Sequence, residues 1–551
     1  MSSLNQGEER PEDTGCTRDD APVVPARRAY WRSLDDLQDT EDFRAWMHRE
    51  FPSDADLLAG EDRRQFMKLM GASFALAGLG VAACRRIPES HIVPYSARPA
   101  GRVPGNPVYF ASACERGGVA KGLLVRSIDG RPINLEGNPD HPTSVGACDS
   151  ITQSGLLEAY DPHRSRSVHR DDEASDAAAF ATWSDQRFGI ELRKSGGAGL
   201  AVLAECSGSP SMDRMRAEFM DAFPKATWHE WEPITGDQQR AGTEIAFGAP
   251  QRVHPNLEEA DIVVCLDADP LSTHPNASRL ARDWASNRRL DAKNSEDQKL
   301  SRVYAVEGVL SITGMSADDR MAVRNGDVAA VAASIARGLG VSMDGLEALA
   351  GTATFEGRNA EILDAMIRDL KAHPGRCIVM AGGGQPPAVH AMAAAINDAL
   401  GNLGKTVAYT ANPAPSRTAS IRALTDALGA GAVETLVMIG GNPVYDAPAD
   451  LDFADAMGRA KETVHLSLRA NATSVASTWH LPRTHFLESW GDVRAYDGTI
   501  SIVQPTIQPM MPIVQKGWSP IELLAQLAGA EPRDGYDIVR ATEAERSRTM
   551  S

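Results

Sequence analysis

The stretch Leu436-Val437-Met438-Ile439-Gly440-Gly441-Asn442-Pro443 joins an apolar run of strand length to a glycine-rich turn. Similar apolar runs recur at residues 200–203, 262–266, 303–306, 377–380, 407–409 and 464–468. Most are separated by segments of helix length that are rich in Ala, Leu and charged residues, such as 211–223 and 388–400. Buried strands that alternate with helices are typical of doubly wound parallel sheets. We therefore predict an α/β core whose binding sites form at the carboxyl ends of the strands.

A second glycine-rich loop, residues 381–386, follows the apolar run at 377–380. Glycine allows positive φ and a close approach of backbone to a ligand, and the N-terminus of a following helix favours an anion. Gly382, Gly383, Gly440 and Gly441, with Asn442 and Pro443, are therefore candidate ligand-contacting residues. Neither loop fits the dinucleotide or P-loop fingerprint, so ordinary NAD or P-loop nucleotide binding has no support. A tight strand–helix connection is the alternative for each loop.

The composition is that of a globular protein with room for two or three domains. The 551 residues carry a formal net charge of −18, with 6% aromatic residues and no long Lys/Arg run, so we exclude a nucleic-acid-binding surface. The seven cysteines are far apart and form no C-x-x-C pair. This spacing excludes a disulfide scaffold and a compact zinc finger.

An export signal is predicted at residues 63–84. Arg63-Arg64, Phe66 and Lys68 precede an uncharged stretch rich in Ala, Gly and Leu, which is shorter than the roughly 20 residues that span a bilayer. This pattern is typical of the twin-arginine pathway. Cys84 ends a lipobox-like sequence; lipidation of Cys84 and an unmodified cysteine are both open interpretations.

The segments on either side of the signal have their own character. Residues 1–62 form an acidic leader with 7 Arg against 16 Asp and Glu, in which Tyr30, Trp31, Phe43, Trp46 and Phe51 predict a helical docking motif. A Pro-rich linker is expected at 85–107. It is followed by a β-rich unit at 108–196, the α/β core at 197–487 and a β-rich C-terminal segment at 488–551.

Several motifs resemble the molybdopterin (bis-guanine dinucleotide) oxidoreductase family. They are residues 129–142 (DGRPINLEGNPDHP) with Cys148, residues 160–162 (YDP), residues 440–443 (GGNP), and residues 479–482 (WHLP) with Glu488 and Gly491. The leader, opening at 30–34 (YWRSL), resembles the branch that includes the large iron–sulfur subunit of alternative complex III, a membrane quinol-oxidising complex. The resemblance covers about residues 108–530, and it makes the two glycine loops vestigial pterin-loop candidates.

The chain departs from this family at the cluster ligands. Catalytic members bind a [4Fe–4S] cluster through four cysteines, and the corresponding positions here are Cys114, Gly117, Lys121 and Cys148. Such a cluster needs four thiolates. Cys114 and Cys148 are therefore expected to be degenerate remnants that hold no metal.

Two further departures concern molybdenum and the missing second half of the relatives. No residue can be named as a molybdenum ligand, and no cysteine follows Cys377, whereas the resembled branch continues into a ferredoxin-like part rich in cysteines. We therefore expect no resident cofactor, with bis-molybdopterin guanine dinucleotide and [4Fe–4S] as the alternatives. The electron-carrying part is expected either on another polypeptide or in a part of the protein outside this sequence.

Other chemistries have weaker support. His480, His485 and Glu488 could suggest zinc, but their spacing does not match H-E-x-x-H, and core or surface histidines are the preferred interpretation. The sequence contains no G-x-S-x-G elbow that would indicate a hydrolase.

The functional hypothesis is a non-catalytic structural subunit of a respiratory quinol-oxidising complex resembling alternative complex III. It would lie on the periplasmic side of the bacterial cytoplasmic membrane and hold an iron–sulfur protein with ferredoxin-like clusters, beside multihaem cytochrome and quinol-site membrane subunits. The apolar run at 491–518 is predicted to contribute to that interface. The alternatives are a catalytic molybdopterin-dependent oxidoreductase subunit and a free-standing binding protein that uses the pterin crevice.

Overall fold

The computed structural model describes residues 40–50, 103, 105–289, 300–341, 354–510 and 517–550. The chain divides into two compact units, Met1–Pro99 and Ala100–Ser551. In the first unit the described part includes helix α2 (Glu41–Glu50), in which the rings of Phe43 and Trp46 lie 5.8 Å apart. Tyr30, Trp31 and Phe51 of the predicted docking motif lie outside the described residues. Within the described residues, no helix combines the length and the apolar character needed to cross a membrane. The predicted signal and lipidation residues lie outside the described residues: Arg63, Arg64, Phe66, Lys68 and Cys84.

The second unit begins with a three-stranded antiparallel sheet. Its strands are β1 (Val108–Arg116), β2 (Val119–Ile128) and β3 (Arg131–Gly137), in that order. The predicted β-rich unit is correct to residue 137, but it does not extend to 196. Helix α5 (Ser150–Tyr160) packs on β3, and α6 (Ala177–Ser184), η1 (Asp185–Leu192) and α7 (Arg193–Ser195) follow. The side chains of Asp149 and Asp176 cap α5 and α6, which is why helices start there.

The larger sheet has seven strands in the order β5-β4-β16-β15-β14-β6-β7. Neighbouring strands from β16 to β7 are parallel, whereas β4 and β5 pair antiparallel at one edge. Their bounds are β4 (Val168–Arg170), β5 (Glu173–Ser175), β6 (Leu200–Ala204), β7 (Thr227–Glu230), β14 (Thr435–Ile439), β15 (Glu462–Ser467) and β16 (Trp479–Pro482). Every residue of β6 and β14 is buried, as expected for parallel strands covered on both faces.

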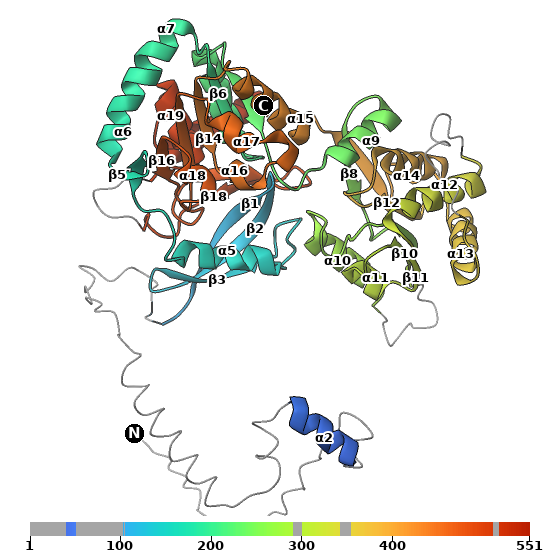
Figure 1. Cartoon of the computed structure of the whole chain (residues 1–551). Coiled ribbons are helices and arrows are strands. Elements are labelled where there is room, and N and C mark those ends of the chain that lie inside the picture. Colours follow the sequence, from blue (N-terminus) through green and yellow to red (C-terminus); the bar gives the residue numbers. More distant parts are fainter. Residues whose placement is uncertain are drawn as a thin grey trace, which may run out of the picture. The chain divides into compact units, whose positions relative to one another are not determined.

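A second parallel sheet has the order β11-β10-β9-β12. Its strands are β9 (Ile262–Leu266), β10 (Arg302–Glu307), β11 (Asp319–Ala322) and β12 (Cys377–Ala381). In Figure 1 this sheet forms one lobe of the unit together with α12 (Val328–Leu339), α13 (Arg358–Ala372) and α14 (Pro387–Ala399). The seven-stranded sheet belongs to the other lobe. The predicted strand at 407–409 is present as β13 (Val407–Ala411), but not in a parallel core sheet. It pairs antiparallel with β8 (Gln251–Pro255) and is largely exposed beyond Val407, so it does not have the two covered faces of a parallel strand.

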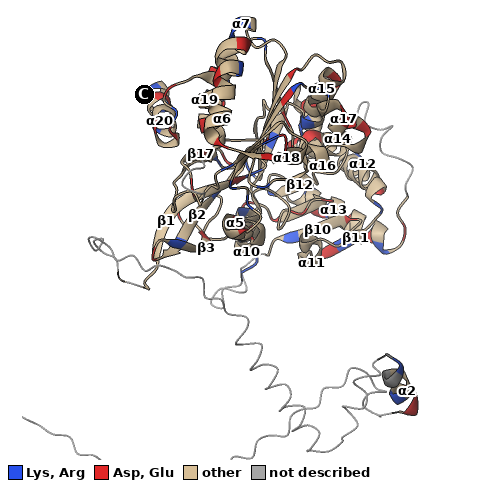
Figure 2. Cartoon of the chain, turned by 60° about the vertical axis from the view of Figure 1, so that its left-hand side comes forward, with Lys and Arg blue, Asp and Glu red and all other residues tan. Residues whose placement is uncertain are grey.

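Helices cover the faces of these sheets, as predicted for 211–223 and 388–400. The remaining helices are α8 (Pro210–Ala222), α9 (Asp237–Phe247), α10 (Ala277–Ser286), α11 (Ile312–Ser316), η2 (Asn325–Asp327), α12 (Val328–Leu339), α13 (Arg358–Ala372), α14 (Pro387–Ala399), α15 (Arg417–Gly429), α16 (Pro443–Asp446), η4 (Ala449–Leu451), α17 (Phe453–Met457) and α18 (Ala472–Val475). In the view of Figure 2, Lys and Arg positions are interspersed with Asp and Glu positions along the described elements.

The C-terminal segment is not β-rich throughout. A hairpin of β17 (Gly491–Arg494) and β18 (Ile500–Val503) is followed by α19 (Pro520–Ala528) and α20 (Gly535–Met550). Ser519 and Glu522 form a capping box that starts α19. In the predicted interface run, Tyr496, Val503 and Trp518 are buried and Ile502 is 40% exposed, whereas residues 511–516 lie outside the described residues. Trp518 belongs to the core that the large sheet shares with α19 and α20, whereas Val503 packs with Ala113 and Ala120 of the three-stranded sheet.

Candidate functional site

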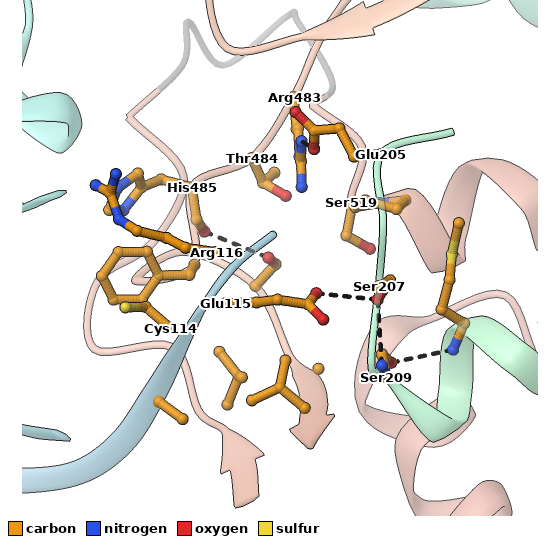
Figure 3. A pocket seen from close by; sticks show the side chains of 18 of the residues that line it. Cys114, Glu115, Arg116, Glu205, Ser207, Ser209, Arg483, Thr484, His485 and Ser519 are labelled. Carbon is orange, nitrogen blue, oxygen red and sulfur yellow. Dashed lines mark hydrogen bonds and ion pairs between the residues drawn. The ribbon is translucent and has the colours of Figure 1, made fainter. Parts of the chain in front are cut away.

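A cavity of about 460 Å³ lies at the carboxyl ends of strands in the seven-stranded sheet, beside β1. Glu205 follows β6, Glu232 lies just beyond β7, Arg483 follows β16, and Glu115 comes from β1. Figure 3 shows Arg483, Thr484 and Glu205 on one side of the cavity and Glu115 on the other. The cavity therefore occupies the position at which binding sites form in α/β sheets.

Glu205 and Arg483 form the central ion pair of the cavity. Nη1 of Arg483 lies 2.6 Å from Oε2 of Glu205, and the N–H of Gly441 donates to Oε1 at 2.7 Å. Burial opposes ionisation of Glu205, but the Arg483 guanidinium and these hydrogen bonds hold its pKa below the usual value. The Arg483 and Glu205 side chains keep 26% and 36% of their surface accessible. Both charges therefore face the cavity.

Two other carboxyl groups lie in an unfavourable environment for charge. Burial raises the pKa of Glu115 to about 7, although Ser207 Oγ donates to it at 2.9 Å and the Gly208 N–H also donates. Burial, together with the negative charge of Glu205, raises the pKa of Glu232 to about 7. The cavity therefore contains carboxyl groups that exchange protons near neutral pH.

The Gly440–Gly441 turn contacts Glu205. Gly440 and Gly441 have φ values of +73° and +71°, and a Cβ on Gly440 would lie 2.1 Å from Cδ of Glu205. The turn thus wraps around a carboxylate of the same chain, and the Gly441 N–H, which could have met a phosphate, is donated to it. A bis-guanine dinucleotide pterin would bring negative phosphates to this acidic turn. The residues present do not fit that cofactor here.

The other glycine loop follows β12 of the other parallel sheet, and the cavity is lined by neither of the two predicted loops. A Cβ on Gly382 would lie 1.9 Å from the carbonyl oxygen of Asp267, whereas Gly383 has open space around it. Gln385 Nε2 donates to Asp267 Oδ2 at 2.8 Å. Gly382 therefore permits close packing of β12 and β9 at their carboxyl ends.

The four degenerate cluster positions are brought together in part. Cys114 and Lys121 face each other in the β1–β2 ladder, Gly117 lies in the connecting turn, and Cys148 is close enough to influence the ionisation of Cys114. Burial raises the pKa of Cys114 to about 12 and that of Cys148 to about 11, and both thiols are free. Lys121 Nζ donates to the carbonyl oxygen of Pro275 at 2.6 Å. With Gly117 and Lys121 in place of two thiolate ligands, these four positions do not fit a [4Fe–4S] cluster, which needs four.

The histidine and glutamate residues weighed as zinc ligands have structural partners. His480 Nε2 pairs with Ser165 Oγ at 2.6 Å, and Glu488 forms a bidentate ion pair with Arg164 at 2.8 and 2.6 Å. Both histidines are buried. Within the described residues, no group of three or more His, Cys, Asp or Glu is arranged to hold a metal ion. The interpretation as core histidines agrees with this geometry.

Glu115, Glu205, Glu232 and Arg483 are not among the site residues predicted from the sequence. The sequence pattern could have indicated two of them, because Glu205 directly follows β6 and Arg483 directly follows β16. Binding sites form at these carboxyl ends of strands. Glu115 carries no such signal, since it belongs to a different sheet.

No family model matches the chain. The molybdopterin-binding-like subunit of menaquinone reductase from Nitratidesulfovibrio vulgaris is 23% identical over 430 residues, which cover 71% of this chain and 60% of that protein. Acetylene hydratase from Pelobacter acetylenicus matches the structure with a TM-score of 0.56 at 11% identity, over 77% of this chain and 70% of that chain. This chain has the fold of a molybdopterin oxidoreductase. The predicted α/β fold class is thereby confirmed, and both comparisons support the resemblance to that family. The structural likeness concerns the fold alone.

Proposed function

We propose that this chain is a structural subunit of a respiratory, quinone-linked electron-transfer complex, with no redox cofactor of its own. More specifically, we propose that the complex oxidises quinol and resembles alternative complex III, and that an iron–sulfur protein docks on this subunit. Multihaem cytochrome and quinol-site membrane subunits complete the proposed assembly. Export through the twin-arginine signal would place the subunit on the periplasmic side of the cytoplasmic membrane.

The observation that carries the cofactor-free proposal is Glu205 in the Gly440–Gly441 turn. A carboxylate held there by Arg483 and by the Gly441 N–H takes the position of an anion that the turn would otherwise bind. The replacement of two cluster ligands by Gly117 and Lys121 is an independent second argument.

The similarity to the menaquinone reductase subunit supports a quinone-linked complex. That relative is named for reducing menaquinone, whereas the resemblance to alternative complex III implies quinol oxidation. The two reactions run in opposite directions on the same type of redox couple. The direction of electron flow is therefore part of the proposal to be tested.

We place the iron–sulfur partner on the exposed face of α5. Ile151 and Leu157 on this helix are 60% and 70% exposed, and Tyr160 and Ile133 extend the apolar surface onto β3. Helix α5 begins at Ser150, two residues after Cys148, one of the cluster remnants. An apolar face over the position of a lost cluster suits a partner that supplies clusters.

Metal analysis of the natively purified protein tests the cofactor-free proposal. We expect molybdenum and iron far below stoichiometry in the isolated chain, because neither donor set fits the corresponding group. About one molybdenum or about four irons per chain after anaerobic purification would contradict it and support the catalytic alternative.

Purification of the complex from membranes tests the structural role. A cysteine-rich iron–sulfur protein should co-purify with the wild-type chain in mild detergent, and Leu157→Asp should reduce its recovery at least about tenfold by desolvating a charge in the interface. Ile234→Asp, at a site that is 92% exposed, is the matched control and should retain the partner. A lone wild-type monomer would overturn the structural role.

A further inference from the structure

We propose that the cavity between Glu115, Arg483 and Thr484 binds a small organic cation with a hydrogen-bond-donating head and a short apolar body. This inference goes beyond the structural role and does not depend on assembly with a partner.

The charges that line the cavity favour a cation. Carboxyl groups come from Glu115, Glu158, Glu205, Glu232 and Asp492, whereas guanidinium groups come from Arg116 and Arg483. His485 also lines the cavity, but burial lowers its pKa to about 4, so this ring is neutral at pH 7. Arg483 forms its ion pair with Glu205, so Arg483 does not serve as the direct ion-pair partner of Glu115 or Glu232. A positive ligand would supply that partner.

An unpaired hydroxyl gives a second, independent indication of a ligand. Thr484 is 6% exposed, lines the cavity, and its Oγ1 has no hydrogen-bond partner. Figure 3 shows its side chain beside Arg483, on the side of the opening that faces Glu115. A buried hydroxyl without a partner costs free energy, and a ligand N–H would relieve that cost.

The size and walls of the cavity suit an organic ligand better than a metal ion. The volume of about 460 Å³ is in the range of small-molecule sites. Apolar walls come from Met212, Ile439, Leu468 and Val493. Among the described residues, none of the carboxyl groups belongs to a set that could hold a metal. A guanidinium group offers five donors and no acceptor, which matches carboxyl and hydroxyl acceptors.

Proton release should accompany binding. The pKa of both Glu115 and Glu232 is raised to about 7 in the free protein, and a bound cation would favour their ionised forms. The affinity for a cation should then rise by about tenfold between pH 6 and pH 8 for each carboxyl group that ionises.

Isothermal titration calorimetry on the full chain tests the proposal with propylguanidinium and its uncharged analogue propylurea. At pH 8 we expect propylguanidinium to bind at least about tenfold more tightly than propylurea. The affinity for propylguanidinium should also fall toward pH 6 as described above. Glu115→Gln should weaken binding of propylguanidinium by about tenfold or more, because it removes the negative charge and keeps the shape. Glu356→Gln, on the exposed surface of the other lobe, is the control and should bind as the wild type does.

A Thr484→Val variant keeps the test decisive if Glu115→Gln does not fold, since it removes only the hydroxyl and should also weaken binding of propylguanidinium. No binding of propylguanidinium at millimolar concentration, equal affinity for the two analogues, or unchanged affinity in the folded variants would overturn the proposal.

Discussion

Glu488→Gln should destabilise the fold strongly. The Glu488 carboxylate accepts two hydrogen bonds from Arg164 at 2.8 and 2.6 Å, and one each from the backbone N–H groups of His485 and Met510 at 2.9 Å. The side chains of Arg164 and Glu488 are 3% and 0% exposed. Glutamine keeps the shape but has one acceptor oxygen, so its amide nitrogen must face a donor.

The expected cost follows from the burial of the pair. Removing one charge of a buried ion pair costs about 3–5 kcal/mol, because the remaining charge is left without a partner. No cavity is created, so packing adds little. Replacing both residues, as in Arg164→Met with Glu488→Leu, should recover about 2 kcal/mol or more of that loss, because no buried charge remains.

Urea unfolding followed by tryptophan fluorescence measures this effect. Trp479 and Trp518 lie in the core of the same lobe, with ring centroids 5.4 and 5.6 Å from that of Phe180. Glu434→Gln is the control: Glu434 pairs with Lys461 at 2.9 Å on the surface, and the midpoint should not change measurably.

The pH dependence provides a second measurement. Burial alone would raise the pKa of Glu488, but the hydrogen bonds and charge of Arg164 lower it below the usual value. Its contribution is therefore present above the unfolded-state pKa and is lost as pH falls through the folded-state value. A loss below about 1 kcal/mol at pH 7, or a double variant as unstable as the sum of the singles, would refute the assigned role of the pair.

Three further outcomes are expected. Replacing Arg63 and Arg64 together by lysine should leave the protein in the cytoplasm, because the paired guanidinium groups are the receptor-read part of the signal; unchanged periplasmic delivery in cell fractionation would contradict this. Gly440→Ala should lower the free energy of unfolding in urea titration by about 2 kcal/mol or more, because φ is +73° and the new Cβ would meet Glu205. Gly429→Ala, where a Cβ meets open space, is the control and should change the stability little; equal effects of the two variants would refute the close contact. The free energy of unfolding should fall as pH rises from about 5 to about 8, because the folded-state pKa of Glu115 is raised to about 7 and the folded state binds the proton more tightly. Glu115→Gln should reduce this fall by on the order of 1–3 kcal/mol, and an unchanged pH profile of the variant would contradict the assignment.

Much of the local structure could be predicted from the sequence. The apolar runs at 262–266 and 436–439 are buried parallel strands, and the prediction at 262–266 has the bounds of β9. These runs are readable because a strand covered on both faces must be apolar at every position. The run at 407–409 was assigned to the wrong kind of sheet, because a short apolar run does not specify its partner strand.

The helices after residue 137 were missed for a related reason. Asp149 and Asp176 each cap a helix, but isolated caps do not stand out in a segment whose apolar periodicity is weak. The helices at the C-terminus were overlooked because Pro and β-branched residues before residue 518 favoured strands.

The sequence by itself determined the alternation of strands and helices, the loss of two cluster ligands and the two glycine turns. Only the tertiary structure decided what fills the Gly440 turn. Glu205 and Gly441 are 236 residues apart in the chain, and they meet because β6 and β14 are adjacent in the sheet. It likewise decided that Glu115, from another sheet, faces Arg483. Local patterns are set by neighbours along the chain, whereas the charge and shape of a cavity depend on which distant strand ends converge.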